Sequence, residues 1–401
     1  MSNTTITAPV GFRCGAAACG IKKEGVLDLA LLVADGPCAA AAVFTRNRFC
    51  GAPIVVGREH VRGGRLQAVV VNSGCSNVAT GRRGIEDAYE MCRLTGERVG
   101  IPPRYVLPSS TGVIGRFLPM EKIRAGIDAA AADLRGGAEA GQRFARAILT
   151  TDTRPKQACV SLALGGVRAT VAGCCKGSGM IAPHLATMLA YVTTDAAIGA
   201  AWLRRALRTV VEKTFNRVTV DECQSTSDTV AVLANGRAGN RPIRPGSAEA
   251  DAFRRALEEV CGGLAEQIAS DGEGATRVIE VRVAGARSAS DAHRVARAIA
   301  ASPLVKTAVH GGDPNWGRIV QAIGASGATF DPLKVRVCIG ATRVFEQGEP
   351  VREASLDDLR RHMLSRRVEI WVDLGAGAFE DRMLTCDLSR EYVAINAEYT
   401  T

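Results

Sequence analysis

Strand-like and helix-like stretches alternate along this chain, which restricts the folds that it can adopt. Residues 66–71 (LQAVVV) form a β-branched run that leads into turn-rich sequence, a pattern typical of a buried strand. Residues 195–217 place apolar side chains on one side of a helix, and residues 248–268 show a second helical pattern. Alternation of this kind predicts an α/β fold, and it leaves open whether the strands run parallel or antiparallel.

Further elements fit the same pattern. A helix is expected at residues 84–100, and another from Pro119, because proline suits the first turn of a helix. Additional strands are expected within residues 160–171, around Gly165 and Gly166, and at residues 229–233, 277–283, 335–339 and 368–374. Residues 235–245 predict a surface loop that is either a domain boundary or a simple excursion. With 401 residues, the chain has room for one large or two medium domains.

Composition and charge narrow the class of protein. Apolar residues make up 47% of the chain and charged residues 23%, which is ordinary for a soluble globular protein. The net charge of +9 is scattered, so solubility explains it better than nucleic-acid binding. The 13 cysteines show no C-x-x-C spacing and the five histidines are isolated, so we expect a reduced, metal-free cytoplasmic protein. We see no secretory signal and no apolar run long enough to span a membrane.

The most unusual stretch is residues 176–195, KGSGMIAPHLATMLAYVTTD. Gly177, Gly179 and Pro183 interrupt otherwise apolar sequence, which predicts irregular backbone. Irregular backbone of this kind often carries strained functional geometry. A buried turn between two elements is the commoner explanation, and composition alone favours it.

Thr187 in this stretch has a chemical route to becoming a nucleophile. A threonine hydroxyl reacts poorly unless a base takes its proton. If the chain breaks just before Thr187, the freed α-amine titrates at about 7.7–8.0 and can serve as that base. The same hydroxyl could make the cut by attacking the carbonyl of Ala186 in an N-to-O acyl shift. Composition does not show that this happens.

The stretch resembles the self-processing site of the glutamate/ornithine N-acetyltransferase family of arginine biosynthesis. That family has a pattern close to KGSGMIxPNMATML, with cleavage between Ala and Thr. The chain departs from it at His184 and Leu185, and it matches at Lys176, Gly177, Ser178, Gly179, Met180, Ile181, Pro183, Ala186, Thr187, Met188 and Leu189. The resemblance covers essentially the whole chain. It implies a self-processing, N-terminal-nucleophile-like α/β fold, as in the ornithine acetyltransferase/aminopeptidase superfamily. It also implies cleavage into residues 1–186 and 187–401, assembled as two copies of each fragment.

Other segments match the family, and each match implies a role. Residues 108–115 (PSSTGVIG) are similar to its oxyanion segment, where the Thr111 hydroxyl and the Gly112 N–H would stabilise the negative charge of acyl transfer. By the same resemblance, Thr153, Lys176, Glu273, Asn396 and Thr401 would contact the substrate, Lys176 near its carboxylate and Glu273 at its amine. Residues 312–324 (GDPNWGRIVQAIG) also match, and we interpret them as a structural turn that packs Trp316.

The resemblance implies acetyl transfer from N-acetylornithine to glutamate through an acetyl-threonine ester, with ping-pong kinetics. No metal or organic cofactor is expected, and acetyl-CoA stays open as a second donor. Cys75 and Cys223 stand where the family carries other residues, so an acyltransferase of shifted specificity is one alternative. A self-processing amidase or aminopeptidase is the nearest rival. A non-catalytic binding protein that kept the fold is a third, and the retained Lys176, Thr187 and Glu273 argue against it.

Overall fold

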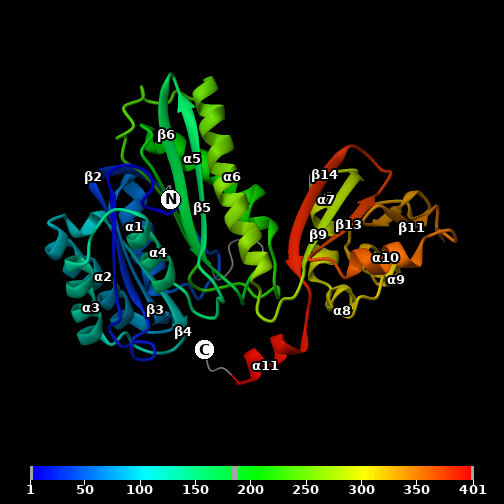
Figure 1. The fold of residues 1–401 in the computed structure, drawn as a ribbon, viewed down its shortest axis with the longest axis horizontal. Helices are drawn as coiled ribbons and strands as arrows, with labels where there is room; N and C mark the ends of the chain where they lie inside the picture. The colour runs from blue at the N-terminus through cyan, green and yellow to red at the C-terminus, as the bar shows by residue number, and fades with distance from the viewer. Residues whose placement is uncertain (1–2, 183–187, 399–401) are drawn as a thin grey trace. The chain divides into compact units, whose positions relative to one another are not determined.

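The computed structural model describes residues 3–182 and 188–398, and the chain divides into two compact units (Figure 1). The first unit comprises Met1–Asn216 and Cys223–Ile268, and the second comprises Arg217–Glu222 and Ala269–Thr400. None of the helices in the described ranges is long and apolar enough to cross a membrane.

An eight-stranded mixed sheet organises the first unit. Its strand order is β4-β3-β2-β8-β7-β6-β5, and β1 pairs with β2. Two neighbouring pairs run parallel, β3 with β4 and β7 with β8, while the remaining pairs are antiparallel. The strands are β1 (Phe12–Ala17), β2 (Leu29–Phe44), β3 (Arg65–Cys75), β4 (Val106–Val113), β5 (Lys156–Leu164), β6 (Val167–Lys176), β7 (Leu189–Thr194) and β8 (Thr229–Ala234).

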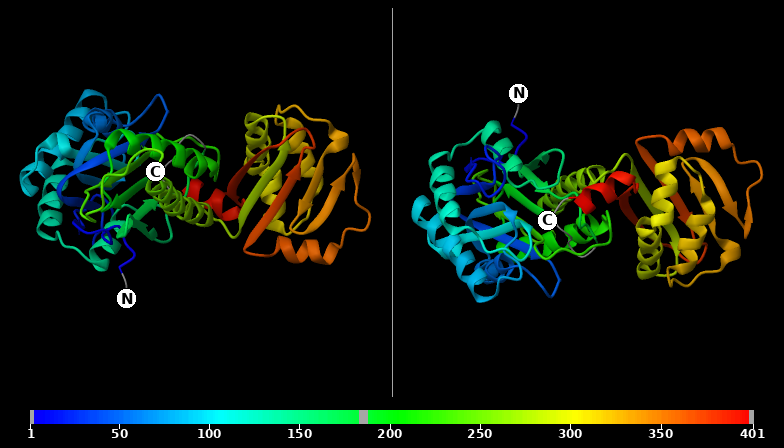
Figure 2. Two further views of the ribbon diagram at one scale, coloured as in Figure 1. Left: turned by 90° about the horizontal axis from the view of Figure 1, so that it is seen from above. Right: turned by 90° about the horizontal axis from the view of Figure 1, so that it is seen from below.

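Helices cover this sheet, and side-chain alternation along β2 sorts the core into two layers. Leu29 and Leu31 belong to a cluster with α1, α2 and α3, whereas Ala30 and Leu32 belong to a second cluster with α4. Helices α1–α3 group together on one side of the sheet in each view (Figures 1 and 2). The helices are α1 (Ala52–His60), α2 (Gly81–Val99), α3 (Met120–Ala132), α4 (Ala138–Ala147), α5 (Ala200–Lys213) and α6 (Ala248–Ser270).

Helix α6 packs along β5 and β6 and also meets α5. The side-chain amide of Gln267 exchanges hydrogen bonds with the backbone of Gln157 on β5, and the Trp202 and Phe253 rings lie 5.9 Å apart. The predicted long helix is shorter than expected at its start, because α5 begins only after Gly199. Asp195 is instead a buried anchor whose carboxylate accepts hydrogen bonds from the backbone N–H groups of Thr170 and Val10.

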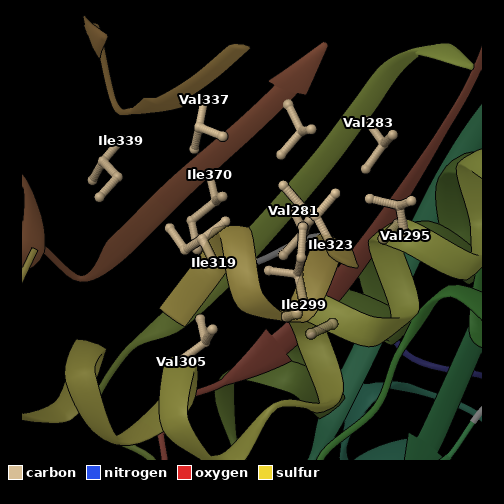
Figure 3. Close-up of a cluster of buried hydrophobic side chains, with 14 of the residues drawn as sticks. Val281, Val283, Val295, Ile299, Val305, Ile319, Ile323, Val337, Ile339 and Ile370 are labelled. Carbon is tan, nitrogen blue, oxygen red and sulfur yellow. The ribbon is translucent and has the colours of Figure 1, made fainter. Parts of the chain in front are cut away.

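A six-stranded sheet in the order β12-β11-β10-β13-β9-β14 forms the second unit. Valine and isoleucine side chains from its strands interleave with those of α7, α8 and α9, as Figure 3 shows for Val281, Ile370, Ile319 and Ile299. The elements are β9 (Val278–Ala286), β10 (Arg336–Ile339), β11 (Thr342–Glu346), β12 (Glu349–Pro350), β13 (Arg367–Asp373), β14 (Phe379–Cys386), α7 (Ala289–Ala301), α8 (Pro303–Gly311), α9 (Trp316–Ala325), α10 (Leu356–Met363) and α11 (Arg390–Glu398).

The α/β prediction is confirmed, and two local expectations are corrected. Trp316 does not sit in a turn but begins helix α9, where the Asn315 side chain caps the first turn, and its ring stacks on Phe345 at 5.6 Å. The run that follows Thr187 is not irregular beyond Met188. It forms β7, and every residue of β7 is buried because neighbouring strands and helices enclose it.

Candidate active site

Asp152 lies at the centre of a buried charged cluster at the end of β6. One of its carboxylate oxygens lies 2.6 Å from Lys156 Nζ and accepts a 2.6 Å hydrogen bond from the Gly177 N–H, while the other lies 4.0 Å from Lys176 Nζ. Burial alone would raise the pKa of Asp152, but the charges of Lys176 and Lys156 outweigh it and lower the pKa to about 2. Two buried lysines therefore lie beside one buried carboxylate at this end of β6.

The predicted oxyanion segment is the end of β4. Gly112 adopts φ +127°, and a Cβ there would lie 2.4 Å from the carbonyl carbon of Gly74, so only glycine fits. The β3–β4 register shifts at Cys75, and such bulges commonly redirect groups beside active sites. Thr111 is buried, and its hydroxyl has no hydrogen-bond partner within the described ranges. The segment therefore holds an uncommitted hydroxyl next to a glycine whose backbone geometry no other residue can reproduce.

The ends of β3 and β4 meet the segment that contains Asp152. The Ser73 hydroxyl donates to the Ala147 carbonyl at 2.6 Å, and Lys22 Nζ donates to the Leu149 carbonyl at 2.7 Å. Burial lowers the pKa of Lys22 to about 8, against the opposing charge of Asp28. The charge of Lys176 contributes to the same shift, which places Lys22 beside the Asp152 cluster. Lys22 belongs to no motif that would have identified it from the sequence.

A row of residues crosses three strands where β7 begins. Lys176 on β6 pairs with Leu189 on β7, and Leu189 pairs with Thr229 on β8. The residue before Leu189 is Met188, whose N–H donates a 2.9 Å hydrogen bond to Asp228 Oδ1. Together with the bond from Gly177 to Asp152, this anchors both ends of the segment in which cleavage was predicted.

Asp228 is another residue of the site that the sequence motifs do not predict. Its carboxyl is completely buried, directly before β8. A run of backbone hydrogen bonds joins the neighbouring Thr226 through Gly51, Ala52 and Asn77 to the loops that follow β3 and β4. The loop that precedes Asp228 is therefore linked by backbone hydrogen bonds to the loop that follows β3 and, through Ser76, to Val113 at the end of β4.

In the second unit, Glu273 and Asn396, both predicted to contact the substrate, lie together. The Asn396 side-chain amide donates a 2.8 Å hydrogen bond to the buried Glu273 carboxylate. Asn396 belongs to helix α11, and the Ser389 hydroxyl just before that helix donates to the Gly274 carbonyl at 2.6 Å. Gly274 is needed there, because a Cβ would lie 2.5 Å from the Tyr392 nitrogen.

The remaining predicted positions have varied outcomes. Thr153 is exposed and directly follows Asp152. Ala186, Thr187, His184 and Thr401 lie outside the described residues, so their predicted roles stay predictions. Of the two cysteine departures, Cys75 is buried with its Sγ against the Arg116 carbonyl, whereas Cys223 is exposed. Within the described residues, no group of three His, Cys, Asp or Glu side chains could hold a metal ion.

Comparison with known proteins identifies the family. The model of the ArgJ family matches residues 13–401. The chain belongs to the ArgJ family. Two ArgJ relatives, each named arginine biosynthesis bifunctional protein, come from Symbiobacterium thermophilum (50% identical, covering 99% of this chain and 98% of the relative) and Geobacter sulfurreducens (47% identical, covering 98% and 99%). A crystal structure of the ArgJ protein of Bacillus halodurans is 42% identical with a TM-score of 0.51, and covers 52% of this chain and 98% of its own. The family resemblance predicted from the sequence is thus confirmed, and with it the assignment to arginine biosynthesis.

Proposed function

We propose that this ArgJ-family chain transfers the acetyl group of N-acetylornithine to glutamate, using Thr187 as the nucleophile after cleavage between Ala186 and Thr187. The observation that carries the proposal is the anchoring of both ends of the predicted cleavage segment by buried carboxyls. The Gly177 N–H is bound by Asp152, and the Met188 N–H is bound by Asp228. Because buried carboxyls hold the segment at both ends, its reacting groups can be kept in the geometry that cleavage of one peptide bond requires.

Self-cleavage would begin with attack of the Thr187 hydroxyl on the Ala186 carbonyl carbon. The C–N bond breaks, an ester forms, and the nitrogen of Thr187 gains the proton that the hydroxyl loses. Water then hydrolyses the ester, which gives residues 1–186 a new carboxylate and residues 187–401 a free α-amine. One residue thereafter carries both the nucleophile and its base.

Acetyl transfer would use the same hydroxyl. It attacks the acetyl carbonyl of N-acetylornithine while the α-amine takes its proton, and the Thr111 hydroxyl and Gly112 N–H stabilise the oxyanion. The proton passes to ornithine as it leaves, and an acetyl-threonine ester remains. The amine of glutamate then attacks that ester, which releases N-acetylglutamate and restores Thr187.

Charge supports this choice of substrates. Both N-acetylornithine and glutamate carry an α-carboxylate, and the buried ammonium group of Lys176 is a cation of the kind that binds such a group. We assign Lys176 to that carboxylate, with Thr153 and Thr401 as further contacts. Glu273, held by Asn396, is the acidic group that we assign to the amine of ornithine.

The two fragments would stay together after cleavage because they share one sheet. Strands β7 and β8 belong to residues 187–401, and they lie between β2 and β6, which belong to residues 1–186. Separation would expose unpaired strand edges on both fragments. We also propose the family's arrangement of two copies of each fragment. The Bacillus halodurans chain, almost all of which matches about half of this one, supports a division of the chain into fragments.

The function is tested with purified protein, N-acetylornithine and glutamate. We expect N-acetylglutamate to form only when both substrates are present, with ping-pong kinetics. Release of free acetate without glutamate would instead identify an amidase. Substituting acetyl-CoA for N-acetylornithine in the same assay shows whether it is a second donor.

A further inference from the structure

Glu273 is a buried carboxylate whose only hydrogen-bond partner within the described ranges is neutral. The residue is 8% exposed, and its Oε2 accepts the Asn396 side-chain amide at 2.8 Å. Glu273 forms no ion pair with any other described residue. Burial of a carboxylate is costly unless a cation lies beside it. These contacts agree with the assignment of Glu273 to the amine of the substrate.

The backbone around Glu273 belongs to neither a helix nor a strand. Residues 271–277 connect α6 to β9, and a bond from the Ala275 N–H to the Gly272 carbonyl at 2.9 Å closes a turn within them. No helix or strand pairing fixes the direction of a side chain in such a connection. The direction of the Glu273 carboxylate therefore depends on contacts from other parts of the chain.

Asp387, the residue after β14, supplies three of these contacts. Its carboxylate has no solvent exposure. Oδ1 accepts the backbone N–H groups of Thr276 and Arg277 at 2.7 and 2.8 Å, and Oδ2 accepts the Thr276 hydroxyl at 2.6 Å. Hydrogen bonds to an ionised acceptor are shorter and stronger than those between neutral groups. One carboxylate thus fixes the end of the segment that carries Glu273.

His310 on α8 is a further partner of this carboxylate. Its Nδ1 lies 2.8 Å from Asp387 Oδ2, and the guanidinium of Arg277 donates to the His310 carbonyl at 2.9 Å. Burial would raise the pKa of Asp387, but the hydrogen bonds from Thr276 and His310 outweigh it and lower the pKa. The carboxylate is therefore ionised at neutral pH and binds its partners in its charged form.

The chain that follows Asp387 leads directly to the partner of Glu273. Two residues later, the Ser389 hydroxyl donates to the Gly274 carbonyl at 2.6 Å. Helix α11 then begins, and it carries Asn396, which binds Glu273. Asp387 thus joins the end of one segment of the candidate site to the start of the other.

We propose that Asp387 is a positioning residue for the substrate amine, an inference that rests on the proposed function. By holding Thr276 and Arg277, it fixes the direction in which the Glu273 carboxylate faces the terminal amine of N-acetylornithine. Asp387 acts through Glu273 and contacts no substrate itself. Its loss should therefore weaken binding of that amine and spare the acyl-transfer step.

Two acetyl donors separate binding of the amine from general damage to the fold. N-acetylornithine carries the terminal amine, and N-acetylnorvaline has the same carbon chain without it. The readout is the preference for N-acetylornithine, which is the ratio of the two kcat/KM values with glutamate as the acceptor. If N-acetylnorvaline turns over too slowly, its inhibition constant is compared with KM for N-acetylornithine.

The variants are made in the full-length chain, and thermal melting reports whether each one folds. Asp387→Asn removes the negative charge, and Thr276→Val removes one hydroxyl bond but keeps both backbone N–H groups. Asp381→Asn is the matched control. Asp381 is a largely buried aspartate of the same unit that also binds a histidine, and its partners His293 and Arg217 lie outside the segments of Glu273 and Asn396.

We expect the wild type and Asp381→Asn to show the same preference for N-acetylornithine. Asp387→Asn should reduce this preference roughly 10–100-fold, the effect of losing one hydrogen bond to a charged group. The change should come from a higher KM for N-acetylornithine, with kcat less affected and N-acetylnorvaline almost unaffected. Thr276→Val should act in the same direction by a smaller factor, and it decides the matter if Asp387→Asn fails to fold.

Two results would overturn the positioning role. One is an unchanged preference in the folded Asp387 and Thr276 variants, and the other is an equal loss with both donors, which would make Asp387 purely structural. Glu273→Gln tests the assignment beneath the inference, because a wild-type preference in that variant would remove Glu273 from the amine. A wild-type chain that forms no N-acetylglutamate would instead contradict the proposed function, so these failures are distinguishable.

Discussion

The carboxylate of Asp152 accepts a 2.6 Å hydrogen bond from the backbone N–H of Gly177 while also pairing with Lys156 at 2.6 Å. This single carboxylate therefore fixes the start of the segment in which cleavage is proposed and compensates a lysine with no solvent exposure. The Asp152 carboxylate therefore serves both the stability of the fold and the proposed cleavage. Loss of the carboxylate should affect both, and the two effects can be measured separately.

Asp152→Asn should destabilise the first unit by about 3–5 kcal/mol, because it removes the negative charge that pairs with the buried Lys156 ammonium. Urea denaturation followed by circular dichroism measures this. The control is Asp128→Asn, which breaks the exposed ion pair with Arg98 and should change stability very little. Equal effects of the two substitutions would contradict the buried-pair account.

The stability that Asp152 contributes should depend on pH in the acid range. Its pKa falls from 3.8 to about 2 on folding, so the unfolded chain binds the proton more readily. The contribution is fully present above about pH 5 and is lost as the pH falls toward 2. The difference in unfolding free energy between wild type and Asp152→Asn should therefore shrink from about pH 5 to about pH 2. A constant difference would show that the ionised carboxylate is not what stabilises the fold.

Thr111→Val should slow acetylation of the enzyme by about 10²–10³-fold, because it removes one donor to the oxyanion. Stability should change little, since the hydroxyl has no partner within the described ranges. Thr95→Val, which removes another buried and unpartnered hydroxyl from α2, is the matched control and should acetylate normally. Pre-steady-state mass spectrometry gives the rates. A substitution at Gly112 is a poorer test, because any side chain there collides with Gly74.

Asn396→Ala should raise KM for N-acetylornithine roughly tenfold, about the free energy of one charge-assisted hydrogen bond, by freeing the Glu273 carboxylate to move. The rate constant kcat should change less, because the proposed mechanism gives Glu273 a role in binding the substrate amine and none in the acyl-transfer step. Asn315→Ala, which removes the cap of α9, controls for general loss of stability in the second unit. An unchanged KM would remove Asn396 from substrate binding.

The parts of the fold that sequence predicts are those set by local pattern. Residues 66–71 became the centre of β3, and residues 248–268 became most of α6, because their periodicity alone determines which side is buried. Strand β7 was hidden in an apolar run, since a strand buried on every side shows no alternation. Helix α11 was missed because its start is fixed by the distant Gly274 rather than by its own sequence.

The residues of the candidate site also divide into those that local sequence predicts and those that it does not. Thr111, Lys176 and Glu273 were named through their motifs, whose residues are contiguous in the chain. Asp228 and Lys22 gain their significance only from strand order and long-range packing. Asp228 reaches Met188 because β8 lies beside β7. The sequence of neither segment predicts that these two strands are neighbours.

The central claim is that the bond between Ala186 and Thr187 opens and that Thr187 then carries the acetyl group. Intact mass spectrometry of the purified chain, before and after incubation with N-acetylornithine, tests both parts at once, with Thr187→Ala as the control. The account predicts two masses matching residues 1–186 and 187–401, with one acetyl group added to the second, and a single unmodified chain for the variant. A wild-type preparation that transfers acetyl groups as one uncut chain would contradict it.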